Sequence, residues 1–288
     1  MLKLIHFFLR KVGIDRAIAY TVLSRVVQAA GGIVTLLFVA NNLTSVEQGY
    51  YYTFGSILAI QIFFELGLSN IITQFVAHEN AHLIWNDKYS FYGSIESSSR
   101  LSSLLRFTIK WFAVIGILLF VGLLITGYYF FNKFGKTGDI VDWQKPWVIL
   151  SISTSLSLMI SPILAFFEGL GKVKEVAKIR LVQQIVQLSL VLSFFLLGFK
   201  LFSSPLAALI SFFIILLWTL NGVNKKILIF IWYKIDKYHV NYKKEIFPFQ
   251  WKIALSWISG YFIFQLFVLP MGDMHHRLDI ENRQILLS

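Results

Sequence analysis

The stretch Trp111–Phe131, WFAVIGILLFVGLLITGYYFF, contains no charged residue and is long enough to cross a membrane as a helix. At a rise of about 1.5 Å per residue, about 20 apolar residues span the hydrocarbon core of a bilayer. Transmembrane β-strands would be half as long and would alternate in polarity. Six further stretches share its length and apolar character: Ala17–Val39, Tyr52–Phe75, Trp147–Phe167, Leu181–Phe199, Pro205–Gly222 and Ile253–Leu269. The sequence therefore predicts an all-α, polytopic membrane protein with seven transmembrane helices.

The composition supports this class and narrows the function. Of the 288 residues, 57% are hydrophobic and 14% are charged, and the mean hydropathy is +0.68. Soluble proteins carry about a quarter charged residues. The chain has no cysteine, which excludes disulfide bonds and thiolate metal sites. It also contains no phosphate-binding loop, no dinucleotide-binding glycine pattern and no soluble segment long enough for a catalytic domain. We therefore expect neither an enzyme nor a cofactor.

The net charge of +11 comes mainly from loops on one side of the predicted membrane. Short cytoplasmic loops retain Lys and Arg, which places the amino terminus in the cytoplasm. The cations flank membrane spans and lie among aromatic residues, which favours contact with anionic lipid headgroups over binding of nucleic acid. The residues assigned to the cytoplasmic side are Lys3, Arg10, Lys11, Arg16, Lys88, Arg100, Arg106, Lys110, Lys172, Lys174, Lys178, Arg180, Lys225, Lys226, Lys234, Lys237, Lys243, Lys244 and Lys252.

Two charged residues fall inside predicted spans, Arg25 in the first and Glu65 in the second. Charge within a membrane is costly and generally faces a bundle interior or a water-filled cavity. Their depths are similar, about 12 and 15 Å from the cytoplasmic ends, so the two side chains can pair. Arg25 also belongs to one helical stripe of the first span, which comprises Thr21, Arg25, Gln28, Gly32 and Thr35. Two interpretations stay open: Arg25 locks the first two helices together, or the stripe lines a hydrated cavity and offers charge to an anionic substrate.

A second polar stripe opens the fifth span and contains Arg180, Gln183, Gln184 and Gln187. It predicts a polar vestibule, although glutamine also hydrogen-bonds between membrane helices simply to hold them together. The residues expected to line a substrate cavity are Arg25, Gln28, Glu65, Arg180, Gln184 and Gln187. Between these regions, Ser97–Trp111 places Leu101, Leu104, Leu105 and Thr108 on one side and predicts an interfacial helix that leads into the third span.

The pentapeptide His78–His82, HENAH, matches the H-E-x-x-H pattern of zinc proteases. In that pattern two histidines one turn apart bind zinc and the glutamate acts as general base. A catalytic zinc needs a third protein ligand, and Glu96 and Asp236 lie in no recognisable partner motif. We expect no metal site, and an intramembrane metalloprotease that uses His78, Glu79 and His82 is the alternative.

Three short segments resemble one transporter family. Residues 42–52 (NLTSVEQGYYY) and 61–67 (QIFFELG) resemble the first external loop and second helix of bacterial Wzx-type polysaccharide flippases, in the multidrug/oligosaccharidyl-lipid/polysaccharide exporter superfamily. Residues 167–173 (FEGLGKV) resemble the loop between helices four and five of that family. The resemblance covers roughly residues 17–269.

The resemblance implies a function in the bacterial inner membrane. Such a protein moves an O-antigen or other surface-polysaccharide unit, carried on polyprenyl diphosphate, across the membrane by alternating access. The implied partners are the lipid-linked oligosaccharide, membrane lipids and other polysaccharide-assembly membrane proteins. Arg25 best suits a position beside the diphosphate, because an arginine matches phosphate oxygens bidentately. A multidrug exporter of the same superfamily remains a further alternative.

Members of the family have two six-helix lobes, whereas this chain contains one lobe and a seventh span. The expected organisation is a membrane lobe at 1–223, a cytoplasmic basic linker at 224–252, the start of a missing second lobe at 253–270 and a polar tail at 271–288. We therefore expect a truncated or frame-shifted family member that depends on a second lobe or a partner for transport.

Overall fold

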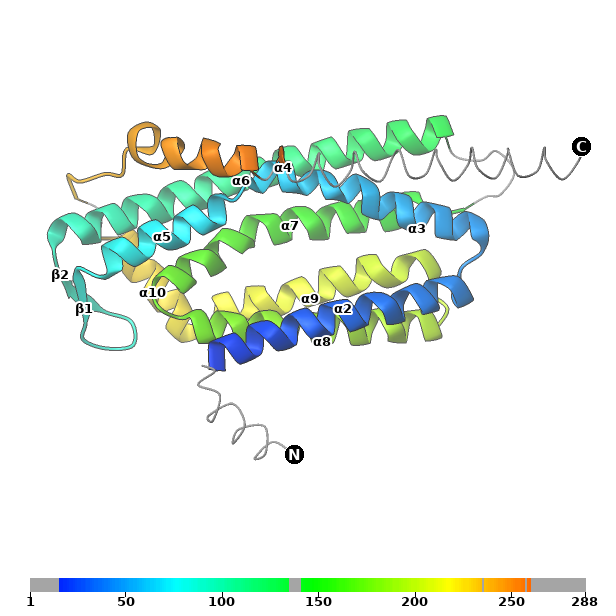
Figure 1. The fold of residues 1–288 in the computed structure, drawn as a ribbon, viewed down its shortest axis with the longest axis horizontal. Coiled ribbons are helices and arrows are strands. Elements are labelled where there is room, and N and C mark those ends of the chain that lie inside the picture. The colour runs from blue at the N-terminus through cyan, green and yellow to red at the C-terminus, as the bar shows by residue number, and fades with distance from the viewer. Residues whose placement is uncertain (1–15, 135–140, 235, 257, 260–288) are drawn as a thin grey trace, which may run out of the picture.

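The computed structural model describes residues 16–134, 141–234, 236–256 and 258–259, and Figure 1 shows their arrangement. Within these residues six helical stretches are long and apolar enough to cross a membrane: Arg16–Asn42, Ser45–Asn80, Ile95–Lys133, Gln144–Gly169, Val173–Leu196 and Lys200–Thr219. They correspond in order to the first six predicted spans. The predicted class, an all-α polytopic membrane protein, is confirmed. Most of the predicted seventh span, Ile253–Leu269, lies outside the described residues.

The chain forms these elements in order: α2 (Arg16–Asn42), α3 (Ser45–Leu58), η1 (Ala59–Gln61), α4 (Ile62–Glu65), α5 (Leu68–Asn80), β1 (Leu83–Trp85), β2 (Phe91–Gly93), α6 (Ile95–Phe134), α7 (Gln144–Gly169), α8 (Val173–Leu196), η2 (Lys200–Phe202), α9 (Ser203–Thr219), α10 (Gly222–Trp232) and the π-helical turn η3 (Tyr242–Ile246). The two strands form an antiparallel hairpin in which Ile84 pairs with Tyr92. The remaining elements make a helical bundle.

Helix α7 lies at the centre of the bundle (Figure 1). It packs against α5 and α6 on one side and against α9 on the other, while α2 packs against α8. In the most apolar 18-residue stretch of α7, 50% of the residues are buried, whereas the corresponding share is 17% in α2 and in α8. The outer helices therefore expose apolar surface, as expected for helices that face lipid.

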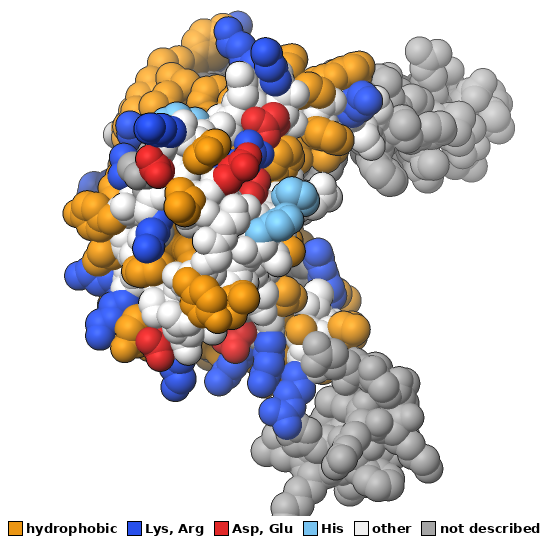
Figure 2. All heavy atoms as spheres, turned by 90° about the vertical axis from the view of Figure 1, so that its left-hand side faces the viewer, with side chains coloured by type: hydrophobic (Ala, Val, Ile, Leu, Met, Phe, Trp, Pro, Cys, Tyr) orange, Lys and Arg blue, Asp and Glu red, His pale blue; other side chains and the backbone are white. Residues whose placement is uncertain are grey.

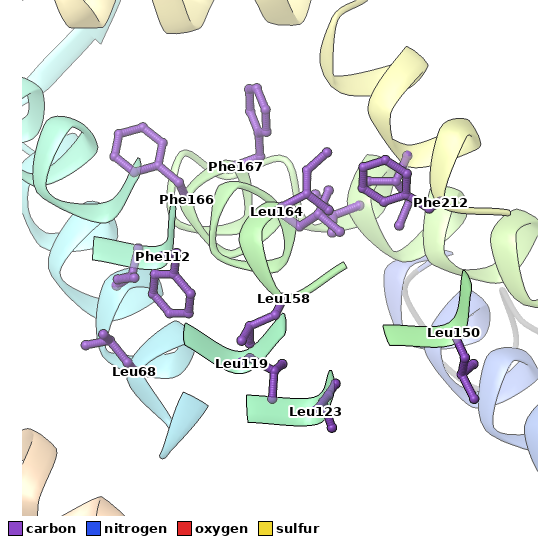
Figure 3. Close-up of a cluster of buried hydrophobic side chains, with 14 of the residues drawn as sticks. Leu68, Phe112, Leu119, Leu123, Leu150, Leu158, Leu164, Phe166, Phe167 and Phe212 are labelled. Atoms are coloured by element: carbon purple, nitrogen blue, oxygen red, sulfur yellow. The ribbon is translucent and has the colours of Figure 1, made fainter. Parts of the chain in front are cut away.

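Close packing joins α6 to α7 in the core. Leu119 and Leu123 of α6 lie beside Leu158 of α7 (Figure 3). The indole Nε1 of Trp147 donates a hydrogen bond of 3.1 Å to the carbonyl oxygen of Leu123. Gly127 makes this contact possible, because a Cβ at that position would lie 2.0 Å from Trp147 Nε1. Shape complementarity thus holds two spans together where the hydrophobic effect has no water to act against.

The second span is broken rather than continuous. Residues 59–61 form a 3-10 turn, and α4 ends at Glu65. The next two residues, Leu66 and Gly67, have φ angles of +44° and +72°. Positive φ interrupts an α-helix, and a non-glycine residue rarely adopts it. The span predicted over Tyr52–Phe75 is present within Ser45–Asn80, but it is not one continuous α-helix, because apolar length does not reveal a kink inside a span.

Helix α6 is much longer than the bilayer is thick. Its 40 residues extend about 60 Å, twice the hydrocarbon core. The segment Ser97–Trp111 is a helix that leads into the third span, as predicted, and the side that carries Leu101, Leu104 and Leu105 is completely buried against the protein. The predicted linker, 224–252, packs on this part of α6. Its helix α10 contacts α6, and the segment around Tyr238 forms a hydrogen bond with Ser99.

Among the described residues, the loops assigned to the cytoplasm by charge lie at one end of the bundle, which we call the basic end. Figure 1 places there the start of α2, the hairpin, α10 and the turn between α7 and α8. Figure 2 looks onto this end, where Lys and Arg side chains occupy much of the rim. Successive helices therefore run in alternating directions between the two ends of the bundle, as the charge pattern predicts.

Candidate functional site

An open cavity of about 560 Å³ lies between α2, α3, α8 and α9. Three of the six residues predicted to line a cavity do so: Gln28 of α2, and Gln184 and Gln187 of α8. Both polar stripes thus face the same space. The hydrogen-bonding side chains of the lining are Gln28, Thr35, Tyr51, Gln184, Gln187 and Ser204. The lining combines amides, hydroxyls and one phenol with aliphatic side chains, and it contains no ionisable acid or base apart from that phenol.

Direct contact between α2 and α8 forms one wall of the cavity. Gly31 of α2 lets the helices approach, because a Cβ there would lie 2.9 Å from Leu188 Cδ2. The Ser24 hydroxyl donates a hydrogen bond to Gln184 Oε1. The Ser211 hydroxyl of α9 lies 3.5 Å from Gln187 Oε1. These bonds engage the amide oxygens and leave the amide NH₂ groups of both glutamines as donors.

Arg25 lies beside the cavity, not in its lining. Its side chain is exposed, and Nη1 donates to Gln28 Oε1 at 3.4 Å. Gln28 in turn lines the cavity. Among the described residues no carboxylate lies within ion-pair distance of Arg25, so its charge is available to a ligand at the edge of the site.

Glu65 does not pair with Arg25, and the predicted pairing is wrong. Glu65 is the last residue of α4, in the broken span, whereas α2 packs on α8 on the other side of the bundle (Figure 1). Similar depth fixes the height of a residue in the membrane but not the helix it faces. Glu65 instead lies directly before the kink at Leu66 and Gly67.

Arg180 also lies outside the cavity lining. Its Nη2 forms an ion pair of 3.3 Å with Glu168 Oε1, at the turn between α7 and α8. Lys172 in the same turn donates to Asn224 Oδ1 of α10 at 3.0 Å, and burial lowers the pKa of its ammonium group. Arg180 therefore connects two spans at the basic end.

The HENAH segment ends α5, and its glutamate reaches toward α6 while its Oε1 also lies 3.8 Å from His78 Nδ1. Glu79 has a side chain only 4% exposed, and its Oε1 accepts a hydrogen bond of 2.7 Å from Arg100 Nε. His78 points outward with 72% of its side chain exposed, and His82 Nδ1 lies 3.0 Å from the His78 carbonyl oxygen. No group of three His, Asp or Glu side chains suited to a metal exists among the described residues. The carboxylate thus serves an ion pair in the interior.

Arg100 joins two carboxylates that lie far apart in the sequence. Besides Glu79, it binds Glu245 through Nη2–Oε2 at 2.5 Å. The guanidinium holds the pKa of Glu245 below its usual value of 4.5. We call Glu79, Arg100 and Glu245 the charge hub. Sequence reasoning missed it, because no local pattern links α5, α6 and the π-helical turn.

The segment that carries Glu245 is fixed to α6 by further hydrogen bonds. Ser99 Oγ donates to the Tyr238 carbonyl at 2.7 Å and accepts from the Asp236 N–H at 2.7 Å. Arg106 Nη2 donates to the Trp232 carbonyl at 2.7 Å and stacks 4.9 Å from the Trp232 ring. The serine-rich start of α6 was the one sequence signal for this contact, since buried serine hydroxyls commonly form hydrogen bonds to backbone groups.

Comparison of the chain with protein-family models, with curated protein sequences and with solved structures finds no match. The structure therefore defines the protein by its class alone. It is a polytopic helical membrane protein with a polar, mostly uncharged cavity at membrane depth.

Proposed function

We propose that this protein is a transporter that moves a saccharide carried on polyprenyl diphosphate from one leaflet of a membrane to the other. The observation that carries the proposal is the open cavity of about 560 Å³ between α2, α3, α8 and α9. Polar groups at membrane depth are costly unless they face a bundle interior or a water-filled space. A cavity of this kind in a membrane helix bundle supports binding of a polar solute.

The lining chemistry suits sugar hydroxyl groups. Glutamine amides both donate and accept hydrogen bonds, and the Tyr51 ring offers an apolar face beside them. Arg25 supplies a planar, permanently charged fork at the edge of the cavity, which fits phosphate oxygens. A lipid-linked saccharide combines both groups, with the sugar in the cavity and the diphosphate beside Arg25.

The same lining disfavours a multidrug exporter for lipophilic cations. Such ligands require a carboxylate or several aromatic faces for their charge. The lining contains no Asp or Glu, and Tyr51 is its only aromatic residue. Binding of a lipophilic cation in preference to the saccharide would support the multidrug alternative.

The charge pattern supports a cytoplasmic position for the basic end. Positive residues are retained on the cytoplasmic side of membranes. We therefore place the amino terminus in the cytoplasm and the protein in a bacterial inner membrane. The lipid-linked oligosaccharide is the proposed principal partner, together with membrane lipids and other polysaccharide-assembly membrane proteins.

Binding to the purified chain in detergent tests the proposal. Three ligands are compared: a short polyprenyl diphosphate disaccharide, the same diphosphate without sugar, and the free disaccharide. Replacement of Gln184 and Gln187 by Leu should remove the affinity that the sugar adds, whereas Arg25→Gln should reduce affinity for both diphosphates. Gln183→Leu is the matched control, because Gln183 is on the same helix but does not line the cavity. If the sugar adds no affinity, or Gln183→Leu has the same effect, the proposal is wrong.

A further inference from the structure

Helix α10 lies across the basic end of the bundle rather than along it. Figure 1 shows its axis running across the long direction of the spans. The apolar helix α9 ends at Thr219, and α10 begins at Gly222. Only Leu220 and Asn221 separate them, so the first turn of α10 starts at the depth where the membrane span ends. This placement is typical of a helix in the headgroup layer.

The two faces of α10 differ in a way that fits this position. Asn224, Ile227 and Ile231 are buried against the protein. On the opposite face Lys226 is exposed, and Ile229 and Tyr233 expose 46% and 77% of their surfaces. A face that mixes lysine, aliphatic and aromatic side chains suits a boundary between lipid and water.

A cavity of about 620 Å³ opens on this face, between α10 and the loop of the hairpin. It is lined by Tyr89, Lys226, Ile229, Phe230, Tyr233 and Lys234. Lys226 Nζ lies 5.3 Å from the Tyr89 ring, and Lys234 Nζ lies 4.8 Å from the Phe230 ring. The aromatic rings hold two ammonium groups at one cavity without any carboxylate in its lining.

We propose that this cavity binds the phosphate headgroup of an anionic phospholipid. Lys226 and Lys234 would contact the phosphate oxygens, while Ile229 and Tyr233 lie against the first acyl carbons. The apolar half of the site distinguishes a lipid from a soluble phosphate, which would leave those side chains in water. The inference does not depend on the proposed transport activity, because it concerns a separate cavity at another part of the bundle.

Native mass spectrometry of the full purified chain, titrated with phosphatidylglycerol, tests the site. The double variant Lys226→Gln/Lys234→Gln should bind this lipid roughly thirtyfold more weakly, since each lysine near an anionic headgroup contributes about fivefold. The control Lys174→Gln/Lys178→Gln removes the same charge from exposed positions of the α7–α8 region. It should change binding less than threefold. Tyr89→Ala should weaken binding by an intermediate factor, because it removes one ring that positions Lys226.

Two further ligands separate the possible sources of the phosphate. Phosphatidylcholine should bind far more weakly than phosphatidylglycerol, and inorganic phosphate should not displace the bound lipid. Equal binding of phosphatidylcholine would overturn the role of the lysines. Displacement by inorganic phosphate at millimolar concentration would identify a soluble ligand and overturn the lipid assignment. Equal effects of the two double variants would show that net charge, and not this cavity, attracts the lipid.

Discussion

Arg100 of the charge hub binds two carboxylates at 2.7 and 2.5 Å, whereas Arg25 beside the cavity binds only the amide oxygen of Gln28 at 3.4 Å. The two arginines therefore differ in role: Arg100 joins structural elements, whereas Arg25 is available to a ligand. In the hub every charge has a partner, and the contacts are short. Around the cavity, the contacts that Arg25 and Ser211 make to glutamine amide oxygens are long, 3.4 and 3.5 Å, and involve no carboxylate, so a ligand can replace them at little cost. The difference indicates that full pairing marks structural sites in this protein and incomplete pairing marks binding sites.

The largest expected effect comes from breaking the hub. Arg100→Met leaves the carboxylate of Glu79, 4% exposed, without its partner. Removal of one member of a buried pair typically costs 3–5 kcal/mol, so we expect a loss of about 3 kcal/mol in unfolding free energy. Thermal unfolding of the purified protein in detergent measures it. The matched variant Arg25→Met should cost less than about 1 kcal/mol, and equal losses would erase the distinction between the two regions.

Two glycines provide a packing test of the same comparison. At Gly169, near the basic end of α7, an added Cβ would lie 2.5 Å from Val76 Cβ and 2.7 Å from the Thr73 carbonyl oxygen. Gly169→Ala must therefore displace α5, and such overpacking costs about 1–3 kcal/mol. Gly32→Ala at the cavity meets nothing within 4 Å and should leave stability unchanged or raise it by up to about 1 kcal/mol. Melting temperatures that fall equally for both variants would show that the cavity is as tightly packed as the contact between α5 and α7.

Acid should weaken the hub before it affects the cavity. The Arg100 guanidinium lowers the pKa of Glu245 in the folded protein, so the ion pair contributes fully above the usual carboxyl value of 4.5. This contribution is lost as the pH falls below 4.5 and through the lower folded value. Thermal unfolding from pH 7 to pH 3 should show a larger decline for the native chain than for Glu245→Gln. Parallel declines would show that Glu245 adds no pH-dependent stability.

The smallest expected effect concerns the contact between α2 and α8. Ser24→Ala removes the hydrogen bond to Gln184 Oε1 and should cost about 1 kcal/mol or less, as side-chain bonds between membrane helices usually do. A double-mutant cycle with Gln184→Leu should give a coupling energy of about 0.5 kcal/mol. Additive effects would show that the two side chains do not interact. Ligand affinity should rise in Ser24→Ala, because Gln184 then offers its oxygen to the ligand.

The sequence predicted what depends on local apolar length and on helical periodicity. Six spans follow from uncharged runs such as Trp111–Phe131, because a bilayer demands helices of that length. Gln28, Gln184 and Gln187 were found because a polar stripe on a membrane helix must face the interior. Periodicity indicates which face of a helix turns inward, and in both stripes that face was correct.

What the sequence could not supply is the identity of neighbours. Arg25 and Glu65 share a depth but lie on different sides of the bundle, and Glu79 meets Arg100 and Glu245 across long separations. Tyr51 and Ser204 reach the cavity from helices without a polar stripe. Each of these contacts depends on how helices pack around one another, which no hydropathy profile encodes.

The kink at Leu66 and Gly67 divides the second span into two halves whose contacts differ in part. The first half, α3, packs against α6 and α7 and is also joined to the α8–α9 turn by the 3.0 Å ion pair between Glu47 and Lys200. The second half, α5, packs against the same two helices and is joined to α6 through Glu79 and Arg100. Of the two halves, only α3 contributes a residue, Tyr51, to the cavity lining. The kink therefore separates the part of the span that borders the cavity from the part that belongs to the charge hub.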